Sequence, residues 1–341
     1  MSVPNVVFMD TSIFDGQDYN YESSVFVSFA RVVKGKELTL LLPDPIELEV
    51  RRHIKERAQE AANALEKAKR RAPFLTKWKH WPVKKDGFFA LSWKLDVIAQ
   101  QEWQRFLQLF NVVRLSYEDV RLKEVMQWYD SGRAPFGKGK KRKEFPDAFA
   151  VAAVSEYAVQ NDVAVAVISQ DPDMGSACDH FPSLLHFPSL PAYTEAILSK
   201  DKRLEETRLL LTKNEDTIVD QLCGAFYELN FYLEVPGESE LEEVDVTGFD
   251  LPELRIVALG KAECTVAFDA HVTFKARFSF YDPETYESCG SCTVEDSTSI
   301  TGVAKLRFNN AWDEIDAVFS VKLDKEDIGV ELYENPYDVY Y

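Results

Sequence analysis

The feature that most constrains the fold is a pair of short apolar runs, each followed closely by an aspartate. Val6–Met9 leads directly into Asp10, and the run VAVAVI at residues 163–168 is followed within three residues by Asp171. Apolar runs of this length are typical of strands that are buried on both faces of a parallel sheet. Ligands of open parallel sheets bind at the carboxyl ends of the strands. We therefore expect the two aspartates to meet at one edge of such a sheet.

The first half of the chain alternates strand-like and helix-like segments. Further strands are predicted at residues 38–42 and at Leu184–Phe187. The longest predicted helix begins with Asp44 and Pro45, two residue types that suit the first turn of a helix. Strands that alternate with helices indicate an α/β fold, with a doubly wound parallel sheet flanked by helices. The predicted helices span residues 24–34, 44–71, 94–110, 117–131 and 146–161.

The pattern changes after about residue 200. Residues 201–233 have the amphipathic pattern of one or two helices. Residues 263–282 then alternate apolar and polar side chains almost throughout. A period of two over this length indicates a strand, or a bent pair of strands, in an antiparallel sheet with one solvated face. Residues 299–308 and 314–323 are its expected partners.

Charge divides the chain at the same place. Of 39 Lys and Arg and 57 Asp and Glu in all, residues 1–200 hold 27 and 26, which leaves 12 and 31 for residues 201–341. Such an asymmetry indicates two domains with different partners, because the near-neutral half can accept a polyanion whereas the acidic half repels one. We therefore predict an α/β domain over residues 1–198 and an acidic α+β domain over residues 199–341.

Targeting signals and cysteine usage suggest a compartment. No apolar stretch approaches the roughly 20 residues that span a bilayer, and the N-terminus has neither the basic nor the apolar region of a secretory signal. The five cysteines are scattered and odd in number, which is consistent with reduced thiols. Cys289 and Cys292 have CxxC spacing without a second pair, so a hairpin turn is favoured over a zinc site. We expect a cytoplasmic protein with no membrane partner.

Two more acids belong with the strand-end aspartates. Glu49 lies early in the predicted helix 44–71, and Asp147 lies at the start of the predicted helix 146–161. Four acids in one crevice repel one another unless a cation lies among them, and hard oxygen ligands suit Mg²⁺ or Mn²⁺. Structural alternatives exist, because Asp147 also suits a helix N-terminus and Asp171 a turn beside a proline. Glu47 is a rival for the role of Glu49.

The order of these acids resembles that of a PIN-domain nuclease, and the resemblance covers residues 1–200. FMDTS at 8–12 resembles the opening strand of the family, with its Asp and a following hydroxyl residue. LPDPIELE at 42–49 resembles the segment that places a Glu on the second helix. FPDA at 145–148 and SQDPD at 169–173 resemble the third and fourth acidic motifs. Each motif alone is common, but four of them in this order make the resemblance specific.

The resemblance implies a divalent-metal-dependent nuclease that hydrolyses phosphodiester bonds with two Mg²⁺ or Mn²⁺ ions, about 3.5–4 Å apart. It implies single-stranded RNA as the substrate, cut to leave a 5′-phosphate and a 3′-hydroxyl, and a toxin or antiphage-defence role. The expected catalytic and metal-binding residues are Asp10, Glu49, Asp147 and Asp171, with Asp173 as an auxiliary metal ligand. Thr11, Ser12 and Ser169 are expected to orient these carboxylates.

Basic residues flank the acidic motifs. Lys and Arg supply most of the sequence-independent affinity for nucleic acids through phosphate contacts. Trp78, Trp81 and Trp93 lie among these residues, where they could stack on exposed bases or serve in packing. The candidate nucleic-acid-binding residues are Arg52, Lys69, Arg70, Arg71, Lys138, Lys140, Lys141, Arg142 and Lys143.

Two alternative functions stay open from the sequence. The acidic cluster does not select the sugar, so a DNA nuclease of the same fold is one alternative. A catalytically silent nucleic-acid-binding scaffold that acts through partners is the other. The acidic second domain could form a homo-oligomer, bind a regulatory protein partner or mask the nuclease.

Overall fold

The computed structural model describes two compact units. The first consists of Met1–Glu22 with Val33–Tyr193, and the second of Ser23–Val32 with Thr194–Tyr341. The described residues are 3–34, 36–77, 79, 88–136, 144–199, 201–233, 238–281, 288–309 and 314–330.

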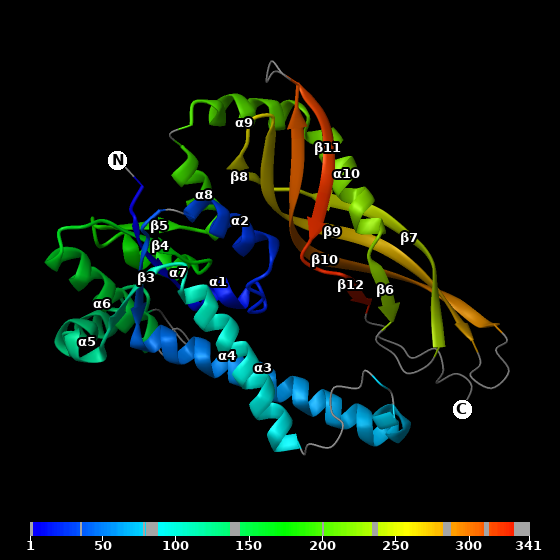
Figure 1. Ribbon diagram of the computed structural model, residues 1–341, viewed down its shortest axis with the longest axis horizontal. Helices are drawn as coiled ribbons and strands as arrows, with labels where there is room; N and C mark the ends of the chain where they lie inside the picture. The colour runs from blue at the N-terminus through cyan, green and yellow to red at the C-terminus, as the bar shows by residue number, and fades with distance from the viewer. Residues whose placement is uncertain are drawn as a thin grey trace. The chain divides into compact units, whose positions relative to one another are not determined.

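The first unit is built on a five-stranded parallel sheet (Figure 1). The strand order β3-β2-β1-β4-β5 places β1 at the centre. The expected α/β class with a PIN-like parallel sheet is therefore confirmed. The strands are β1 (Val6–Met9), β2 (Thr39–Pro43), β3 (Asn111–Leu115), β4 (Val165–Ile168) and β5 (Leu184–Phe187).

Burial explains which strands were visible in the sequence. All four residues of β4 are buried, and β1 and β2 each expose little, so their apolar runs are continuous. The edge strand β3 was not predicted. Its Asn111 and Arg114 are exposed, and they break the apolar run that marks a buried strand.

Helices surround this sheet, and two of them form a long hairpin (Figure 1). In that hairpin α3 packs against α4, and α3 also contacts α6. The elements of the unit are α1 (Thr11–Asp15), α3 (Asp44–Arg71), the 3₁₀ turn η1 (Pro73–Lys77), α4 (Phe88–Leu107), the 3₁₀ turn η2 (Tyr117–Asp119), α5 (Leu122–Ser131), α6 (Phe145–Gln160) and α7 (Pro172–Cys178). The helix α8 (Leu190–Leu198) begins in the first unit and ends in the second.

The second unit contains an antiparallel sheet of order β11-β10-β9-β7, in which β8 also pairs with β9. A short parallel pair, β12-β6, accompanies it. The helices are α2 (Ser24–Val33), α9 (Arg203–Lys213) and α10 (Glu215–Tyr227). The strands are β6 (Asn230–Leu233), β7 (Glu238–Asp250), β8 (Leu254–Leu259), β9 (Glu263–Tyr281), β10 (Ser288–Phe308), β11 (Ile315–Leu323) and β12 (Asp327–Val330).

The alternation of residues along β9 determines the core of the second unit. Phe274 and Phe278 point to one face of the sheet and are buried with Leu222 and Phe226 of α10. Exposed residues such as Lys275 and Arg277 occupy the alternate positions. The predicted antiparallel sheet is therefore present. β10 begins well before the expected segment 299–308, whereas β11 lies within the expected segment 314–323.

One helix lies in a different unit from the one expected. The sequence suggested that residues 1–198 form one domain, but α2 belongs to the second unit. The backbone N–H and the hydroxyl of Ser24 donate to Asp324 Oδ1, at 3.0 and 2.8 Å. Asp324 Oδ2 accepts from Thr301 Oγ1 at 3.1 Å, so this carboxylate joins the start of α2 to β10. Sequence distance concealed this, because 300 residues separate Ser24 from its partner.

None of the helices among the described residues is long and apolar enough to cross a bilayer. Cys178, Cys223, Cys264 and Cys292 are free thiols. The side chain of Cys289 lies outside the described part of the chain.

Candidate active site

The candidate site lies where β1 and β4 end side by side. These strands are parallel neighbours, and Met9 pairs with Ile168 as the last residue of each. The backbone N–H of Asp10 donates to the Ile168 carbonyl at 2.9 Å, which extends the ladder by one step. Asp10 is buried, and Asp171 lies just beyond the end of β4. The crevice at a strand-order reversal is the usual ligand position in an open parallel sheet, and the order reverses between β1 and β4.

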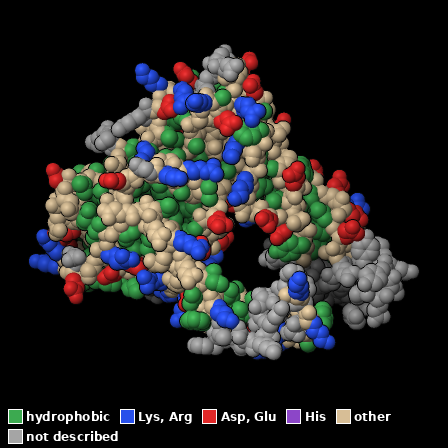
Figure 2. Space-filling view, viewed as in Figure 1, with side chains coloured by type: hydrophobic (Ala, Val, Ile, Leu, Met, Phe, Trp, Pro, Cys, Tyr) green, Lys and Arg blue, Asp and Glu red, His purple; other side chains and the backbone are tan. Residues whose placement is uncertain are grey.

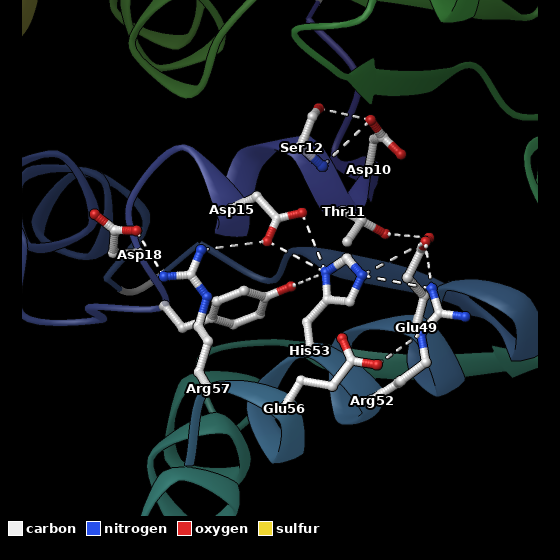
Figure 3. Close-up of polar contacts among 11 residues, drawn as sticks. Asp10, Thr11, Ser12, Asp15, Asp18, Glu49, Arg52, His53, Glu56 and Arg57 are labelled. Carbon is white, nitrogen blue, oxygen red and sulfur yellow. Dashed lines mark hydrogen bonds and ion pairs between the residues drawn. The ribbon is translucent and has the colours of Figure 1, made fainter. Parts of the chain in front are cut away.

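Two serines hold the carboxylate of Asp10. Ser12 Oγ donates to Asp10 Oδ2 at 2.6 Å, and Ser169 Oγ donates to the same oxygen at 2.8 Å. Figure 3 shows the Ser12 contact at the start of α1. Ser169 is completely buried, so its hydroxyl has little freedom to turn elsewhere. These bonds fix the rotamer of Asp10 from two sides.

Ser169 also connects the two strand-end aspartates. Its Oγ accepts from the backbone N–H of Asp171 at 3.0 Å while it donates to Asp10. Asp171 is the N-cap residue of α7, and its Oδ1 accepts from the backbone N–H of Asp173 at 2.8 Å. Asp173 itself lies in the first turn of α7 and is half-buried. Asp171 therefore caps α7, and Ser169 links it to Asp10.

The structure separates Glu47 from Glu49. The carboxylate of Glu47 accepts from Arg51 at 2.7 Å and from Arg114 Nε at 2.9 Å. Glu49, one half-turn further along α3, instead accepts from Thr11 Oγ1 at 3.0 Å. Because Thr11 directly follows Asp10, this bond brings Glu49 to the strand-end aspartates. Two arginines already neutralise Glu47, so the geometry favours Glu49 as the member of the acidic cluster.

Asp147 gives the electrostatic signature of the cluster. Burial raises the pKa of its carboxyl to about 8, with further contributions from the charges of Asp10, Glu144 and Glu49 and from a hydrogen bond with Glu144. The direction follows from the cost of placing a charge in a poorly solvated position near other negative charges. The structure thus brings Asp147 together with Asp10 and Glu49. Glu144 was not among the predicted site residues. Its position three residues before Asp147, in the same motif, was the feature of the sequence that could have indicated it.

A second network of polar residues adjoins Glu49 (Figure 3). His53 Nδ1 lies 3.1 Å from Tyr19 Oη and 3.2 Å from Asp15 Oδ1, while its Nε2 lies 3.9 Å from Glu49 Oε1. Arg57 lies over the Tyr19 ring, 5.3 Å from its centroid. Burial and the charge of Asp15 raise the pKa of Tyr19, so the phenol stays protonated.

The backbone that carries this network is unusual. Asp18 and Tyr19 both have positive φ, at 50° and 58°, which is uncommon for residues with a side chain. No local sequence pattern indicates this network, because its members are contributed by α1, the following turn and α3. On one side of Glu49, the side chains of this network therefore hold one another in place through hydrogen bonds.

The chemistry of these residues suits a divalent cation. The donors are carboxylate oxygens, the ligand type preferred by Mg²⁺ and Mn²⁺. The raised pKa of Asp147 reflects negative charge that a cation would offset. Among the described residues, however, no three His, Cys, Asp or Glu side chains are arranged so that they could hold one ion together. The donor set fits such a cation in its chemistry, although these carboxylates do not form a ready ligand group in this structure.

The predicted basic residues fall into three groups. Arg52 is paired with Glu49 at 3.2 Å and with Glu56 at 3.9 Å, on the exposed side of α3 (Figure 3). Lys69, Arg70 and Arg71 form the last turn of α3, where Lys69 pairs with Glu66. Trp93 is exposed on α4. The remaining candidates, Lys138, Lys140, Lys141, Arg142, Lys143, Trp78 and Trp81, lie outside the described residues.

Comparison with known proteins agrees with this arrangement. The family model of the PIN domain matches residues 7–174, a span that contains Asp10, Glu49, Asp147, Asp171 and Asp173. No curated protein and no solved structure matches the chain. Through residues 7–174, the chain belongs to the PIN-domain nuclease superfamily.

Proposed function

We propose that this protein is a divalent-metal-dependent nuclease that hydrolyses phosphodiester bonds in single-stranded nucleic acid, with RNA as the preferred substrate. The observation that carries the proposal is the gathering of four acids at the ends of β1 and β4. Ser169 joins Asp10 to Asp171 and Thr11 joins the end of β1 to Glu49, while burial and the charges of Asp10, Glu144 and Glu49 raise the pKa of Asp147. A protein gains nothing in stability from crowding buried carboxylates. Perturbed carboxylates in a cleft are the usual sign of a functional site.

Each residue has a defined part in this proposal. Asp10, Glu49, Asp147 and Asp171 would hold the cation or cations, and Asp173 would assist. When bound, divalent ions lower the pKa of the attacking water and stabilise the charge of the leaving oxygen. Without a cation, Asp147 holds a proton at neutral pH. Thr11, Ser12 and Ser169 orient the carboxylates through the hydrogen bonds described above.

The experiment is a cleavage assay on the full-length chain. Labelled single-stranded RNA and DNA of the same sequence are incubated in Mn²⁺, in Mg²⁺ and in EDTA. The double variant Asp10→Asn, Asp147→Asn removes two carboxylates while it keeps their size. Asp179→Asn, an exposed aspartate at the opposite end of α7 from Asp171, is the matched control.

The outcomes separate the candidates. Metal-dependent cleavage that the double variant loses and the control keeps would support the nuclease, and the faster substrate would identify the sugar. Preferential cleavage of DNA would replace RNA by DNA in the proposal. Equal inactivity of the wild type and the double variant would favour the catalytically silent scaffold, which is consistent with the lack of a preassembled three-ligand group among the described residues. The expected toxin or antiphage-defence role rests on the family resemblance alone.

A further inference from the structure

The helical hairpin of α3 and α4 contains a small hydrophobic cluster, between the C-terminal part of α3 and the N-terminal part of α4. Ala62 and Leu91 are buried there, and Leu65, Ala68, Leu75 and Leu95 pack around them. We use "hairpin tip" for the described residues 62–77, 79 and 91–95 that surround this cluster. The cluster gives the backbone of the tip a packed support on which the exposed side chains are carried.

Two large aromatic side chains of the hairpin tip are exposed to solvent. Phe74, in the turn η1, is 69% exposed, and Trp93, in α4, is 60% exposed. Both exceed the exposure of every aromatic residue among the other exposed large hydrophobics. An aromatic ring held in water by a packed scaffold is available to stack on a nucleobase. Figure 2 shows hydrophobic and basic side chains together in the lower part of the view, where α3 and α4 lie.

The tip also carries a strong excess of positive charge. It contains seven Lys or Arg residues and one acidic residue, Glu66, which pairs with Lys69. Exposed cations of the tip that form no ion pair with another described residue are Lys67, Arg70, Arg71, Lys77 and Lys79. The net charge of this small region is therefore available to an outside anion.

The other end of α3 differs sharply. There Arg51 pairs with Glu47, Arg52 with Glu49, and Arg57 with Asp18. These arginines are neutralised within the protein and organise the acidic cluster and its neighbours. The arginines of this helix are thus paired at the site end, whereas Arg70 and Arg71 at the tip form no ion pair with another described residue.

We propose that the hairpin tip is a second binding site for single-stranded nucleic acid, in which Lys and Arg bind phosphates and Phe74 and Trp93 stack on bases. This inference rests on the proposed function, because the hairpin tip would bind the same nucleic-acid strand that the acidic cluster is proposed to cleave. Phosphate neutralisation combined with aromatic stacking is the usual means of holding a single strand without sequence preference.

The length of α3 makes the proposal quantitative. Glu49 and Arg71 are 22 positions apart on one continuous helix, which corresponds to about 33 Å at about 1.5 Å per residue. At about 3.4 Å per nucleotide, the spacing in a stacked strand, about ten nucleotides reach from the acidic cluster to the tip. A stacked strand of six nucleotides is too short to occupy both places, whereas one of 30 reaches both.

An anionic membrane surface would also attract lysines and exposed aromatic rings. We favour nucleic acid because the tip is continuous with the helix that carries Glu49 in a chain of the PIN-domain superfamily. Vesicles therefore serve as one arm of the test.

The experiment measures binding of the full-length chain to fluorescein-labelled single-stranded RNA by anisotropy, in EDTA, where no metal-dependent cleavage occurs. The probes are a 30-nucleotide strand, a 6-nucleotide strand and vesicles with an anionic phosphatidylserine surface. The variants are Phe74→Ala with Trp93→Ala, and Arg70→Gln with Arg71→Gln. Val159→Ala, 72% exposed on α6, and Lys123→Gln, exposed on α5, are the matched controls.

We expect the aromatic pair to weaken binding of the long strand at least about fivefold, since one base–aromatic stack contributes about 1–3 kcal/mol. The arginine pair should reduce the slope of log affinity against log salt by about 1.4, from about 0.7 per lost phosphate contact. Because the tip alone can hold six nucleotides, both variants should also weaken binding of the short strand, and the controls should match the wild type.

Three results would overturn the inference. They are unchanged binding of the long strand by both tip variants, tip-dependent binding of vesicles but not of RNA, and failure of the wild type to bind either strand. Metal-dependent cleavage by the wild type would in each case leave the proposed nuclease function standing, so the two proposals fail separately.

Discussion

Thr11 Oγ1 donates a hydrogen bond of 3.0 Å to Glu49 Oε2, and this bond joins the residue after strand β1 to helix α3. If the bond orients Glu49, Thr11→Val should lower the single-turnover cleavage rate about 10- to 100-fold, because valine keeps the shape and removes the donor. Thr11→Ser keeps a hydroxyl and should retain most of the rate. Circular-dichroism melting would check that both variants fold. Equal rates for valine and serine would show that the bond does not matter for cleavage.

Ser169→Ala should also weaken the site, in this case by releasing the Asp10 carboxylate and the backbone of Asp171. The change removes the 2.8 Å bond to Asp10 and leaves the N–H of Asp171 without its 3.0 Å acceptor. We expect a loss of about 10- to 100-fold in metal affinity, measured by calorimetry with Mn²⁺. Ser155→Ala is the control, because Ser155 is also buried but bonds only the Ala152 carbonyl of its own helix. A similar loss in both variants would assign the effect to general destabilisation.

Asp147→Asn should change how stability depends on pH. The folded-state pKa of about 8 lies above an unfolded value near 3.9, so the folded state binds more protons between these values and the wild type loses stability as pH rises through them. Asparagine cannot ionise and escapes this loss. The difference in Tm, variant minus wild type, should grow from pH 4 to pH 8 by at least about 2 °C in metal-free buffer. A difference that is constant with pH would contradict the raised pKa.

Divalent ions should stabilise the wild type by mass action. A ligand that binds only the folded state adds about 2.7 kcal/mol at one hundred times its Kd. Thermal melting with Mn²⁺ added, and then with excess EDTA, should show a rise in Tm that EDTA reverses. The variant Asp10→Asn, Asp147→Asn should show little of this rise. An equal rise in both proteins would place the bound ion away from the acidic cluster.

Asp324→Ala should loosen the second unit at a defined place. The change removes the acceptor of the Ser24 N–H and hydroxyl and of the Thr301 hydroxyl. Hydrogen-exchange mass spectrometry should show faster exchange in α2, around Thr301 of β10 and at the end of β11, with β1 and β4 unchanged. We expect a loss of about 1–3 kcal/mol in the affected region. Asp316→Ala, an exposed residue of β11, should leave exchange unchanged. Unaltered exchange in α2 for Asp324→Ala would show that this anchor contributes nothing.

The same helix affects how the chain can be divided. A fragment of residues 1–198 would retain α2 without the rest of the second unit and without Asp324, the acceptor of Ser24 at the start of that helix. Variants of the full chain are therefore better tests of the active site than a truncated protein.

The sequence by itself determined the elements whose burial is uniform. The apolar residues of β1 and β4 are hidden from water on both faces, and the alternating residues of β9 are buried on one, so each pattern follows directly from the hydrophobic effect. Asp10 and Asp171 were recognisable because they end such runs. The edge strand β3 was not recognisable, because half-exposed positions leave no pattern to read.

Only the tertiary structure decided which side chains meet. Glu47 and Glu49 look equivalent in the sequence, and Arg114 from β3 and Thr11 from α1 distinguish them. The pKa of Asp147 depends on charges that lie 137 and 98 positions away, on Asp10 and Glu49. The assignment of α2 to the second unit likewise depends on Asp324. Local sequence patterns arise from the burial of each segment by itself, whereas electrostatic and hydrogen-bond partners are set by long-range packing that no local pattern contains.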